Sequence, residues 1–435
     1  MSDGLPARKI AYDIFSDILK KKLPFDQVLD AHRDFPSLDP RDRGFVYMLV
    51  ATALRHLGEC DTLIDRLQNK KNDKEPPIPL QHILRLGLTQ ILYMDVPSHA
   101  AVDTSVRLCE VLRMDKYKSF VNALLRRTLR EQDKLTRDLD TIRLNIPNWL
   151  YSALEADWGK ENAYKIAAAS LIEAPFDLTI KNSVQVSSYA QEMDAKQLFS
   201  NTLRLSLRPS VTELPGYGEG DWWVQDASAA LPATLFGDIA GKTVFDICAA
   251  PGGKTAQLAA AGAKVTALDR SANRLKRLHE NMERLGLGDQ VDVQTQDAAA
   301  WEPNVQADAV LIDAPCSSTG ILRRHPDILH LKSKDDVTAL ANTQRRIFEQ
   351  SAEMVKSGGV LIYCTCSILK EEGEDQTDAF LKNHPEFNRS PITADEIGGY
   401  GELLNDKGEV RILPSHLEDI GGLDGFFIAR FKKAG

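Results

Sequence analysis

The sequence lacks the long apolar runs and the leader that membrane-spanning or secreted proteins carry. No stretch of its 435 residues approaches the ~18 consecutive apolar residues that a membrane span requires. The segment Met1-Ser-Asp-Gly-Leu-Pro-Ala-Arg8 has no apolar signal-peptide core. Six cysteines are spread along the chain, which is too sparse for a disulfide framework. These absences favour a cytoplasmic protein with reduced thiols and disfavour a membrane protein.

The chain also lacks an excess of positive charge, except in one stretch of its first third. The net charge of −9 argues against nucleic-acid binding over the whole surface of the protein. Residues 1–150 nevertheless carry 24 Lys and Arg against 21 Asp and Glu. Residues 113–130, called the basic cluster below, hold six basic side chains and one acidic one, Asp115. The cluster is a candidate phosphate contact, although charge alone favours an ordinary solvated helix face.

The hydrophobic pattern divides the chain into three parts. Residues 1–140 place apolar side chains at three- and four-residue spacing, which predicts an all-α bundle of six or seven helices. Residues 145–218 open with a helix and continue with short alternating segments, which predicts a small α+β connector. From 220 to 435, apolar strands alternate with helices, which predicts a doubly wound, mostly parallel sheet.

A glycine-rich loop follows the first strand predicted for the third part. The loop, Cys248–Lys254, contains a glycine pair that lets a ligand approach the backbone and the start of the next helix. The next two strands lead to Asp269 and Asp297, which are placed to accept hydrogen bonds from ribose hydroxyls and from an adenine amino group. Parallel sheets bind ligands at the carboxyl ends of their strands. The series therefore predicts a nucleotide-type cofactor.

A phosphate-binding P-loop is the main alternative for this segment, because Gly253-Lys-Thr255 resembles the end of that motif. The motif requires a second glycine five residues earlier, where this chain has Cys248. Asp269 and Asp297 would also repel a triphosphate. The cofactor interpretation is therefore preferred.

Two cysteines follow strands of the same predicted sheet. Cys316 comes after the strand Ala309–Ile312, and Cys366 comes after Val360–Tyr363. A free thiol has a pKa of about 8.5, so a nucleophilic cysteine needs a nearby cation or helix start, and Lys254 is a candidate. Strand-end cysteines are otherwise small buried hydrophobes, an interpretation kept for Cys60, Cys109, Cys248 and Cys364.

The motifs of S-adenosylmethionine-dependent RNA cytosine-5 methyltransferases are similar to four segments: Asp246-x-Cys-Ala-Ala-Pro-Gly-Gly-Lys-Thr255, Asp313-Ala-Pro-Cys-Ser317, Arg323-Arg-His-Pro-Asp327 and Thr365-Cys-Ser367. The helical part resembles the NusB-like domain of the bacterial Fmu/Sun (RsmB) family, with Ser98-His-Ala-Ala101 and Phe120-Val-Asn-Ala-Leu-Leu-Arg-Arg127. This resemblance implies a NusB-like RNA-binding domain over 1–140, the connector over 145–218, and a Rossmann-like class I methyltransferase domain over 220–435.

The resemblance also implies a role for each site residue. Cys366 would attack carbon 6 of an unpaired cytosine in small-subunit (16S) ribosomal RNA, so that carbon 5 accepts the methyl group. Cys316 would assist proton removal and enzyme release, Asp313 would hold the ring nitrogen and amine, and Lys254 would lie near the base. The implied cofactor contacts are Cys248, Ala249, Ala250, Pro251, Gly252, Gly253, Lys254, Asp269, Arg270, Asp297 and Asp313. The implied RNA contacts are Arg126, Arg127, Arg130, Lys181, Arg323 and Arg324.

The chain departs from the family pattern at three positions. Lys370 and Gly373 stand where proline and asparagine are usual after the Thr-Cys-Ser motif, which predicts a looser loop near Cys366. Lys181 stands where arginine is usual, which predicts a weaker phosphate contact.

Two other functions remain open from the sequence. A non-catalytic RNA-binding factor would use the helical part alone, and the intact Cys316, Cys366 and Asp313 argue against it. A methyltransferase that acts on an amino group would need neither thiol. We further expect no metal, because no second carboxylate or histidine lies at ligand spacing from Asp313. We also expect a monomer.

Overall fold

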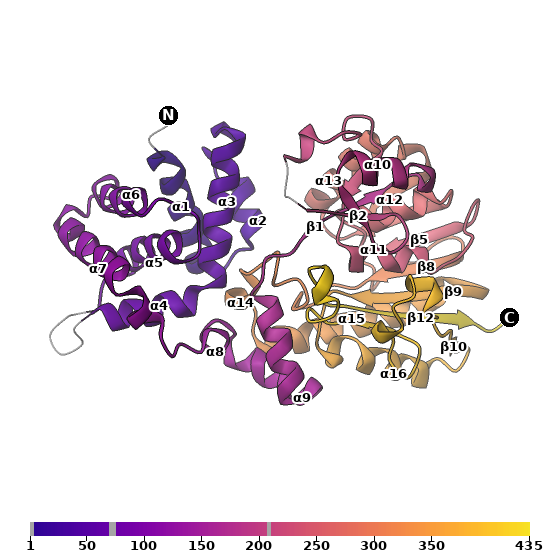
Figure 1. The fold of residues 1–435 in the computed structure, drawn as a ribbon. Helices are drawn as coiled ribbons and strands as arrows, with labels where there is room; N and C mark the ends of the chain where they lie inside the picture. The colour runs from indigo at the N-terminus through magenta and orange to yellow at the C-terminus, as the bar shows by residue number, and fades with distance from the viewer. Residues whose placement is uncertain (1–3, 69–74, 207–209) are drawn as a thin grey trace. The chain divides into compact units, whose positions relative to one another are not determined.

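The computed structural model describes residues 4–68, 75–206 and 210–435. Its contacts divide the chain into two units, whose elements are labelled in Figure 1. The first unit combines Met1–Leu171 with the short segment Arg324–Ser333, and the second contains the rest. These bounds differ from the three parts expected above, because the helix expected to open the connector joins the helical unit.

The helical unit is an all-α bundle, as predicted. Its helices bury one apolar face each, with Phe15, Leu49 and Leu54 among the fully enclosed side chains. Helix α3 shows how the sequence sets a boundary, because Asp39 accepts a hydrogen bond from the Asp42 amide and caps the helix start. The helices are α1 (Leu5–Lys21), α2 (Phe25–Ala31), α3 (Pro40–Arg55), α4 (Leu57–Leu67), α5 (Ile78–Leu92), α6 (Ser98–Val111), α7 (Lys118–Thr136), α8 (Thr141–Asn145) and α9 (Asn148–Ser170).

The segment Arg324–Ser333 belongs to this bundle although it follows Cys316 in the sequence. It contains the short helix α14 (Ile328–Leu331). A carboxylate oxygen of Asp327 accepts a hydrogen bond from the Phe25 amide at 3.0 Å, which satisfies a free N–H at the start of α2. The His330 ring donates to the Leu54 carbonyl at 2.7 Å. The segment is therefore anchored by buried polar contacts within the helical unit.

The second unit contains a small antiparallel sheet with the order β2-β3-β1-β4. A buried ion pair joins two of its strands, because Arg204 donates to both carboxylate oxygens of Asp177, at 2.7 and 2.8 Å. The segment 203–208, one of the alternating segments that the sequence predicts as strands, lies in β3 as far as Leu205, and residues 207–209 lie outside the described residues. The strands are β1 (Phe176–Ile180), β2 (Ala195–Gln197), β3 (Thr202–Leu205) and β4 (Trp222–Val224).

The main sheet has the order β10-β12-β9-β8-β5-β6-β7, with β11 paired to β12. Strands β5 to β9 are parallel and β12 is antiparallel to β9, so the predicted doubly wound, mostly parallel sheet is confirmed. The carboxyl ends of β5 to β9 therefore meet at one edge. The strands are β5 (Thr243–Ile247), β6 (Lys264–Asp269), β7 (Val291–Thr295), β8 (Ala307–Asp313), β9 (Val355–Thr365), β10 (Phe387–Arg389), β11 (Val410–Ile412) and β12 (Phe426–Lys433).

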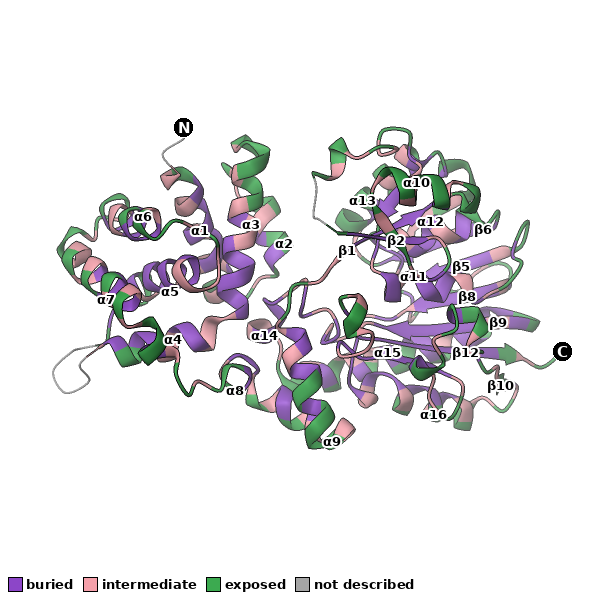
Figure 2. Cartoon of the chain, viewed as in Figure 1, coloured by how far each residue is buried: buried purple, intermediate pink, exposed green. Residues whose placement is uncertain are grey.

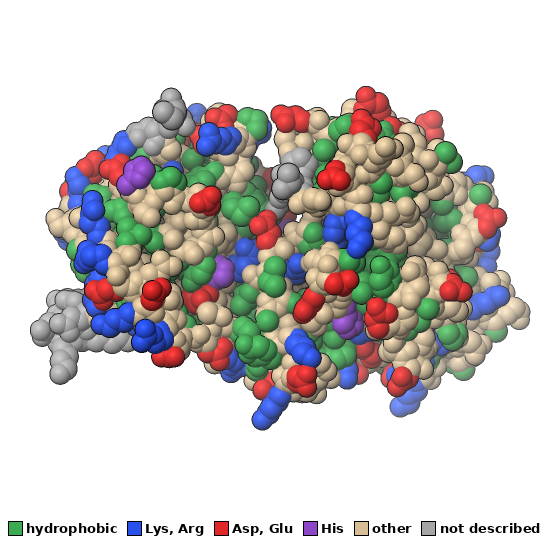
Figure 3. Space-filling model, in the orientation of Figure 1, with side chains coloured by type: hydrophobic (Ala, Val, Ile, Leu, Met, Phe, Trp, Pro, Cys, Tyr) green, Lys and Arg blue, Asp and Glu red, His purple; other side chains and the backbone are tan. Residues whose placement is uncertain are grey.

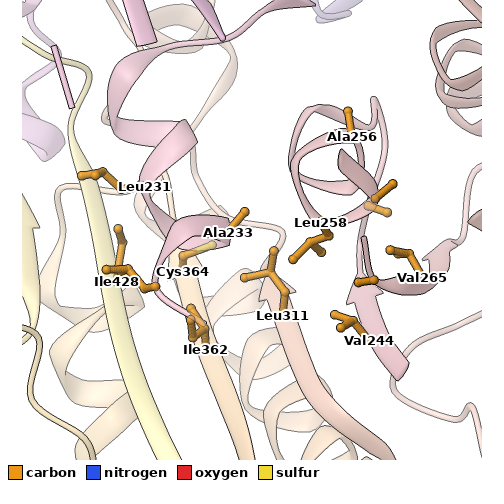
Figure 4. Packing of buried hydrophobic residues seen from close by; sticks show 14 of the residues in the cluster. Leu231, Ala233, Val244, Ala256, Leu258, Val265, Leu311, Ile362, Cys364 and Ile428 are labelled. Carbon is orange, nitrogen blue, oxygen red and sulfur yellow. The ribbon is translucent and has the colours of Figure 1, made fainter. Parts of the chain in front are cut away.

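Both faces of this sheet are covered, which explains why its central strands are mostly apolar. The central strands are buried along their length (Figure 2). On one face, Leu258 of α12 (Gly253–Ala260) lies beside Leu311, and Ala233 of α11 (Ala227–Thr234) lies beside Cys364 (Figure 4). On the other face, Phe348 of α15 (Lys334–Met354) stacks on Tyr363, with ring centroids 4.6 Å apart. Among the described residues, no helix has the length and hydropathy needed to cross a membrane.

Candidate active site

The loop between β5 and α12 brings bare backbone to the carboxyl edge of the sheet. Gly252 has a φ of 104°, and a Cβ there would lie 2.8 Å from the Leu278 side chain, so glycine is required. The loop then enters α12 at Gly253, where free backbone N–H groups favour an anionic group. This geometry matches the cofactor loop expected from the sequence.

Asp246, the fourth residue of β5, contributes a buried acid that had no assigned role in the sequence analysis. Its Oδ2 accepts a hydrogen bond from the Thr255 hydroxyl at 2.6 Å, and its Oδ1 has no hydrogen-bond partner in the part of the chain that is described. Burial raises the pKa of this carboxyl to about 7. An orphaned carboxylate oxygen beside the loop suits the amino group of an amino-acid-like cofactor. The sequence signal that could have pointed to this residue is a single acid within an otherwise mostly apolar strand.

The two predicted ribose and adenine contacts differ in their surroundings. Asp269 ends β6, is 3% exposed, and accepts hydrogen bonds from the Ser271 amide and from Arg274. Arg274 also donates to the Ala250 carbonyl, so it links Asp269 to the glycine-rich loop. Asp297 lies two residues beyond β7 and is exposed, as is Arg270. Arg274 was missed because its sequence context is an ordinary helix start.

The structure brings the two predicted thiols together. Cys316 follows β8 and Cys366 follows β9, and their sulfur atoms lie 3.4 Å apart. The hydrogen bond to Cys366 and burial raise the pKa of Cys316 well above its usual value. Cys364 is fully buried in the apolar core, and its sulfur lies 3.7 Å from Oδ1 of Asp313. Cys316 and Cys366 therefore form a pair that Cys364 does not join.

Lys254 forms a partly buried ion pair with Asp313, with Nζ 2.8 Å from Oδ2. Burial is the largest single influence and lowers the pKa of Lys254, but the Asp313 charge, its hydrogen bond and the other negative groups nearby together raise the net pKa. The cation suggested as a thiol activator thus acts on Asp313, the residue expected to hold the cytosine ring.

The loop after Cys366 is held firmly, which differs from the looser loop expected from the family departures. Arg411 of β11 donates to the Ser367 carbonyl at 2.6 Å and forms an ion pair with Glu374. A Cβ on Gly373 would overlap the Arg411 guanidinium. Glycine at 373 therefore leaves room for Arg411, which fixes the backbone beside the thiol.

The residues of the basic cluster have unequal surroundings. Arg126 and Arg130 are exposed on α7. Arg127 instead donates to the Leu67 carbonyl at 2.9 Å and pairs with Glu131. On the face shown in Figure 3, Lys and Arg side chains along the outer edge of the helical unit are interspersed with Asp and Glu. Of the three arginines of this cluster that were expected to contact RNA, Arg126 and Arg130 are therefore better placed than Arg127 to meet a phosphate.

The other three predicted RNA contacts are engaged with the protein. Arg323 is 3% exposed and donates to backbone carbonyls of Ile172, Glu173 and Gly421, among others, so its burial argues against a phosphate contact. Lys181 is half-buried and donates to the Leu285 carbonyl at 3.0 Å. Arg324 lies in the segment that joins the helical unit. Sequence patterns reveal charge, but they do not reveal these partners.

Within 4–68, 75–206 and 210–435, no group of three His, Cys, Asp or Glu side chains is arranged to hold a metal ion.

A doubly wound sheet with a glycine-rich loop at its switch point, an acid at the next strand end and two further strand-end thiols defines a methyltransferase-type catalytic domain. Residues 234–432 match the family model described as 16S rRNA methyltransferase RsmB/F, and residues 5–130 match the NusB family. A probable ribosomal RNA small subunit methyltransferase B from Synechocystis is 34% identical over 99% of this chain and 100% of its own length. The chain belongs to this family of ribosomal RNA small subunit methyltransferases, and is a S-adenosylmethionine-dependent RNA methyltransferase.

Solved structures agree on the fold. The crystal structure of PH0851 covers 99% of this chain and 98% of its own, with a TM-score of 0.75 at 22% identity. A methyltransferase homolog from Pyrococcus horikoshii is 28% identical, with a TM-score of 0.55, and covers 65% of this chain and 93% of its own.

Proposed function

We propose that this protein transfers a methyl group from S-adenosylmethionine to carbon 5 of a cytosine in 16S ribosomal RNA, through a covalent adduct with Cys366. The observation that carries the proposal is the 3.4 Å separation of the Cys316 and Cys366 sulfur atoms, at the ends of neighbouring strands. A methyltransferase that acts on a stronger nucleophile than a pyrimidine carbon needs neither thiol. Paired thiols beside Asp313 suit a carbon that must first be activated.

The residues at the sheet edge fit the cofactor. S-adenosylmethionine, when bound, would supply an electrophilic methyl group, and its sulfur would keep the electron pair of the broken sulfur–methyl bond as a neutral thioether. The backbone of Cys248–Lys254 would hold its amino-acid part, and the orphaned Oδ1 of Asp246 would accept from its ammonium group. Asp269 would contact the ribose, and Asp297 and Arg270 would lie beside the adenine.

The protein's own groups then act in order. The Cys366 thiolate forms a bond to carbon 6, and the electrons of the 5,6 double bond make carbon 5 nucleophilic enough to accept the methyl group. Asp313, held by Lys254, accepts a hydrogen bond from the exocyclic amine and faces the neighbouring ring nitrogen, and so orients the base. A base then removes the carbon-5 proton, assisted by Cys316, and the bond between carbon 6 and sulfur breaks. The double bond re-forms, and Cys366 leaves as a thiolate.

The names of the relatives and the chemistry of the site support this substrate. The curated relatives are named as small-subunit ribosomal RNA methyltransferases, and the helical unit matches the NusB family. A base can reach both thiols only outside a stack, which costs a few kcal/mol and favours an unpaired cytosine. The exposed Arg126 and Arg130 would contact the RNA backbone.

The position of transfer is tested with 16S ribosomal RNA that carries tritium on carbon 5 of its cytosines. The proposal predicts one tritium released to water for each methyl group transferred, and no release with Cys366→Ala. Transfer to an amino group would leave the tritium in the RNA. Methylation without tritium release from the unmodified protein would therefore contradict the proposal.

A further inference from the structure

Glu372 is a fully buried carboxylate that contacts the Cys316 loop. It lies in the 3-10 helix Lys370–Glu372. Its Oε1 accepts hydrogen bonds from the Ser317 amide at 2.8 Å and from Gln344 at 3.0 Å, and its Oε2 accepts from the Ser317 hydroxyl. Gln344 also donates to the Pro315 carbonyl at 2.9 Å. The residues on either side of Cys316 are thus tied to one carboxylate.

The backbone of the same residue contacts the strand that carries the second thiol. The Glu372 carbonyl accepts a hydrogen bond from the Tyr363 hydroxyl at 2.9 Å and lies 3.5 Å from the Thr365 hydroxyl. Thr365 immediately precedes Cys366. Glu372 therefore contacts both loops, but its charge lies on the Cys316 side.

The negative charge itself needs an explanation. Among the residues that the structure describes, none of the ion pairs includes Glu372, and the groups that donate to it are an amide N–H, a hydroxyl and a side-chain amide. Enclosing a carboxylate with neutral donors alone is costly, and a glutamine would satisfy the same partners more cheaply. A charge retained under such conditions beside a reactive group is typical of functional sites.

We propose that Glu372 is a positioning residue that makes the two thiols unequal, because its charge keeps the proton on Cys316 and leaves the thiolate to Cys366. The inference rests on the proposed function, in which Cys366 attacks and Cys316 assists. It adds a physical reason for that division of roles, which the near-equal placement of two cysteines at neighbouring strand ends does not supply.

The charges around Cys316 agree with this assignment. The largest influences that raise the pKa of Cys316 are the hydrogen bond to Cys366 and burial, and the Glu372 carboxylate raises it further. The Tyr363 hydroxyl is buried close by, and its own pKa is raised by burial and by Glu372. The Asp313 carboxylate, three residues earlier, is paired with Lys254. The Arg411 cation, which lies beside Gly373, is paired with Glu374, so Glu372 adds a negative charge on the Cys316 side.

The test isolates Cys316 in a Cys366→Ser background and adds Glu372→Gln. Glutamine keeps an oxygen for the Ser317 amide and Gln344, and its NH₂ can donate to the Ser317 hydroxyl, so the geometry is retained while the charge is lost. Glu371→Gln is the matched control, because it removes the same charge one residue away, from a side chain paired with Lys334. Thermal unfolding checks that each variant is folded.

The readout is the rate of Cys316 alkylation by iodoacetamide against pH, measured by peptide mass spectrometry without RNA or cofactor. We expect Glu372→Gln to move the alkylation profile to lower pH and to speed labelling at least about threefold at a pH of about 8, where thiolate concentration limits the rate. Glu371→Gln should leave the profile unchanged. An unchanged profile in folded Glu372→Gln, or an equal shift in Glu371→Gln, would overturn the inference.

A second readout separates this inference from the proposed function. With both cysteines present, Glu372→Gln should lower kcat for tritium release while leaving the KM for RNA nearly unchanged. A shifted alkylation profile with no tritium release in the unmodified protein would remove the proposed function and leave the charge effect standing. Normal tritium release in the unmodified protein with an unshifted alkylation profile in Glu372→Gln would leave the proposed function standing and remove the inference about Glu372.

Discussion

The ammonium of Lys254 lies 2.8 Å from the Asp313 carboxylate, so the first residues of α12 are joined to the end of β8. The contact links the loop that fits the cofactor to the strand that leads to Cys316. It also fixes Asp313 in the orientation that the proposed mechanism requires. Lys254, which belongs to the glycine-rich loop, thus positions Asp313, the residue expected to hold the cytosine.

Replacing Lys254 should damage both stability and turnover. Lys254→Met leaves the Asp313 charge without its partner, and removing one member of an ion pair from a site of low exposure costs roughly 2–3 kcal/mol. We expect at least a hundredfold loss of methyl transfer and a lower midpoint in urea unfolding. Lys254→Met combined with Asp313→Asn should recover part of the stability and none of the activity. Unchanged kcat in folded Lys254→Met would contradict this role.

Asp246 should make stability depend on pH. Its folded-state pKa of about 7 lies above the ordinary 3.8, so its protonated form is favoured in the folded protein. Its stabilising contribution is complete below about pH 4 and is lost as the pH rises to about 7, a change of at most roughly 4 kcal/mol. The unfolding free energy of cofactor-free protein, relative to Asp246→Asn, should fall across this range. A difference that stays constant from pH 4 to 7 would exclude this raised pKa.

Cys364 should be replaceable although it lies two residues from Cys366. Its side chain is fully buried among apolar residues of the core (Figure 4), and burial raises its pKa well above the usual value. Cys364→Ala should lower stability by about 1 kcal/mol and leave methyl transfer within twofold of the unmodified protein. Loss of transfer in Cys364→Ala, with retention in Cys366→Ala, would reverse the assignment.

RNA affinity should depend on the exposed part of the basic cluster. Arg126→Glu with Arg130→Glu should weaken binding to ribosomal RNA and lower the salt slope of log K by about 0.7–0.9 for each lost phosphate contact. Arg127→Glu should instead destabilise the bundle, because Arg127 donates to the Leu67 carbonyl. Filter binding across several salt concentrations measures the slope. An unchanged slope in the double variant would show that α7 does not contact the RNA.

The sequence predicted the reactive residues of the site better than the residues that hold them in place. Alternating apolar strands and helices gave the sheet, and residues that follow parallel strands must gather at one edge, which brought Cys316 and Cys366 together. Arg411 was not predictable, because it reaches the Cys366 loop from β11, more than forty positions along the chain. The role of Glu372 was not predictable either, because a run of charged residues gives no sign that one of them is buried.

The positions of basic residues in the sequence were a poor guide to which side chains are free to contact RNA. Arg323 was expected to contact RNA, yet its guanidinium is enclosed by backbone carbonyls. Asp327, in the same motif, caps a helix of the helical unit through a contact more than 300 positions apart. A cationic side chain can meet a phosphate or a carbonyl equally well, and only the packing decides which partner is present.

The central claim, a covalent bond between Cys366 and cytosine, is tested most directly with RNA that contains 5-fluorocytidine. Fluorine on carbon 5 cannot leave as a cation, so the reaction stops after methyl transfer with the base still bonded to sulfur. With cofactor present, we expect a protein–RNA adduct that survives denaturation, forms with Cys364→Ala and is absent with Cys366→Ala. No adduct with the unmodified protein, or an adduct that persists in Cys366→Ala, would contradict it.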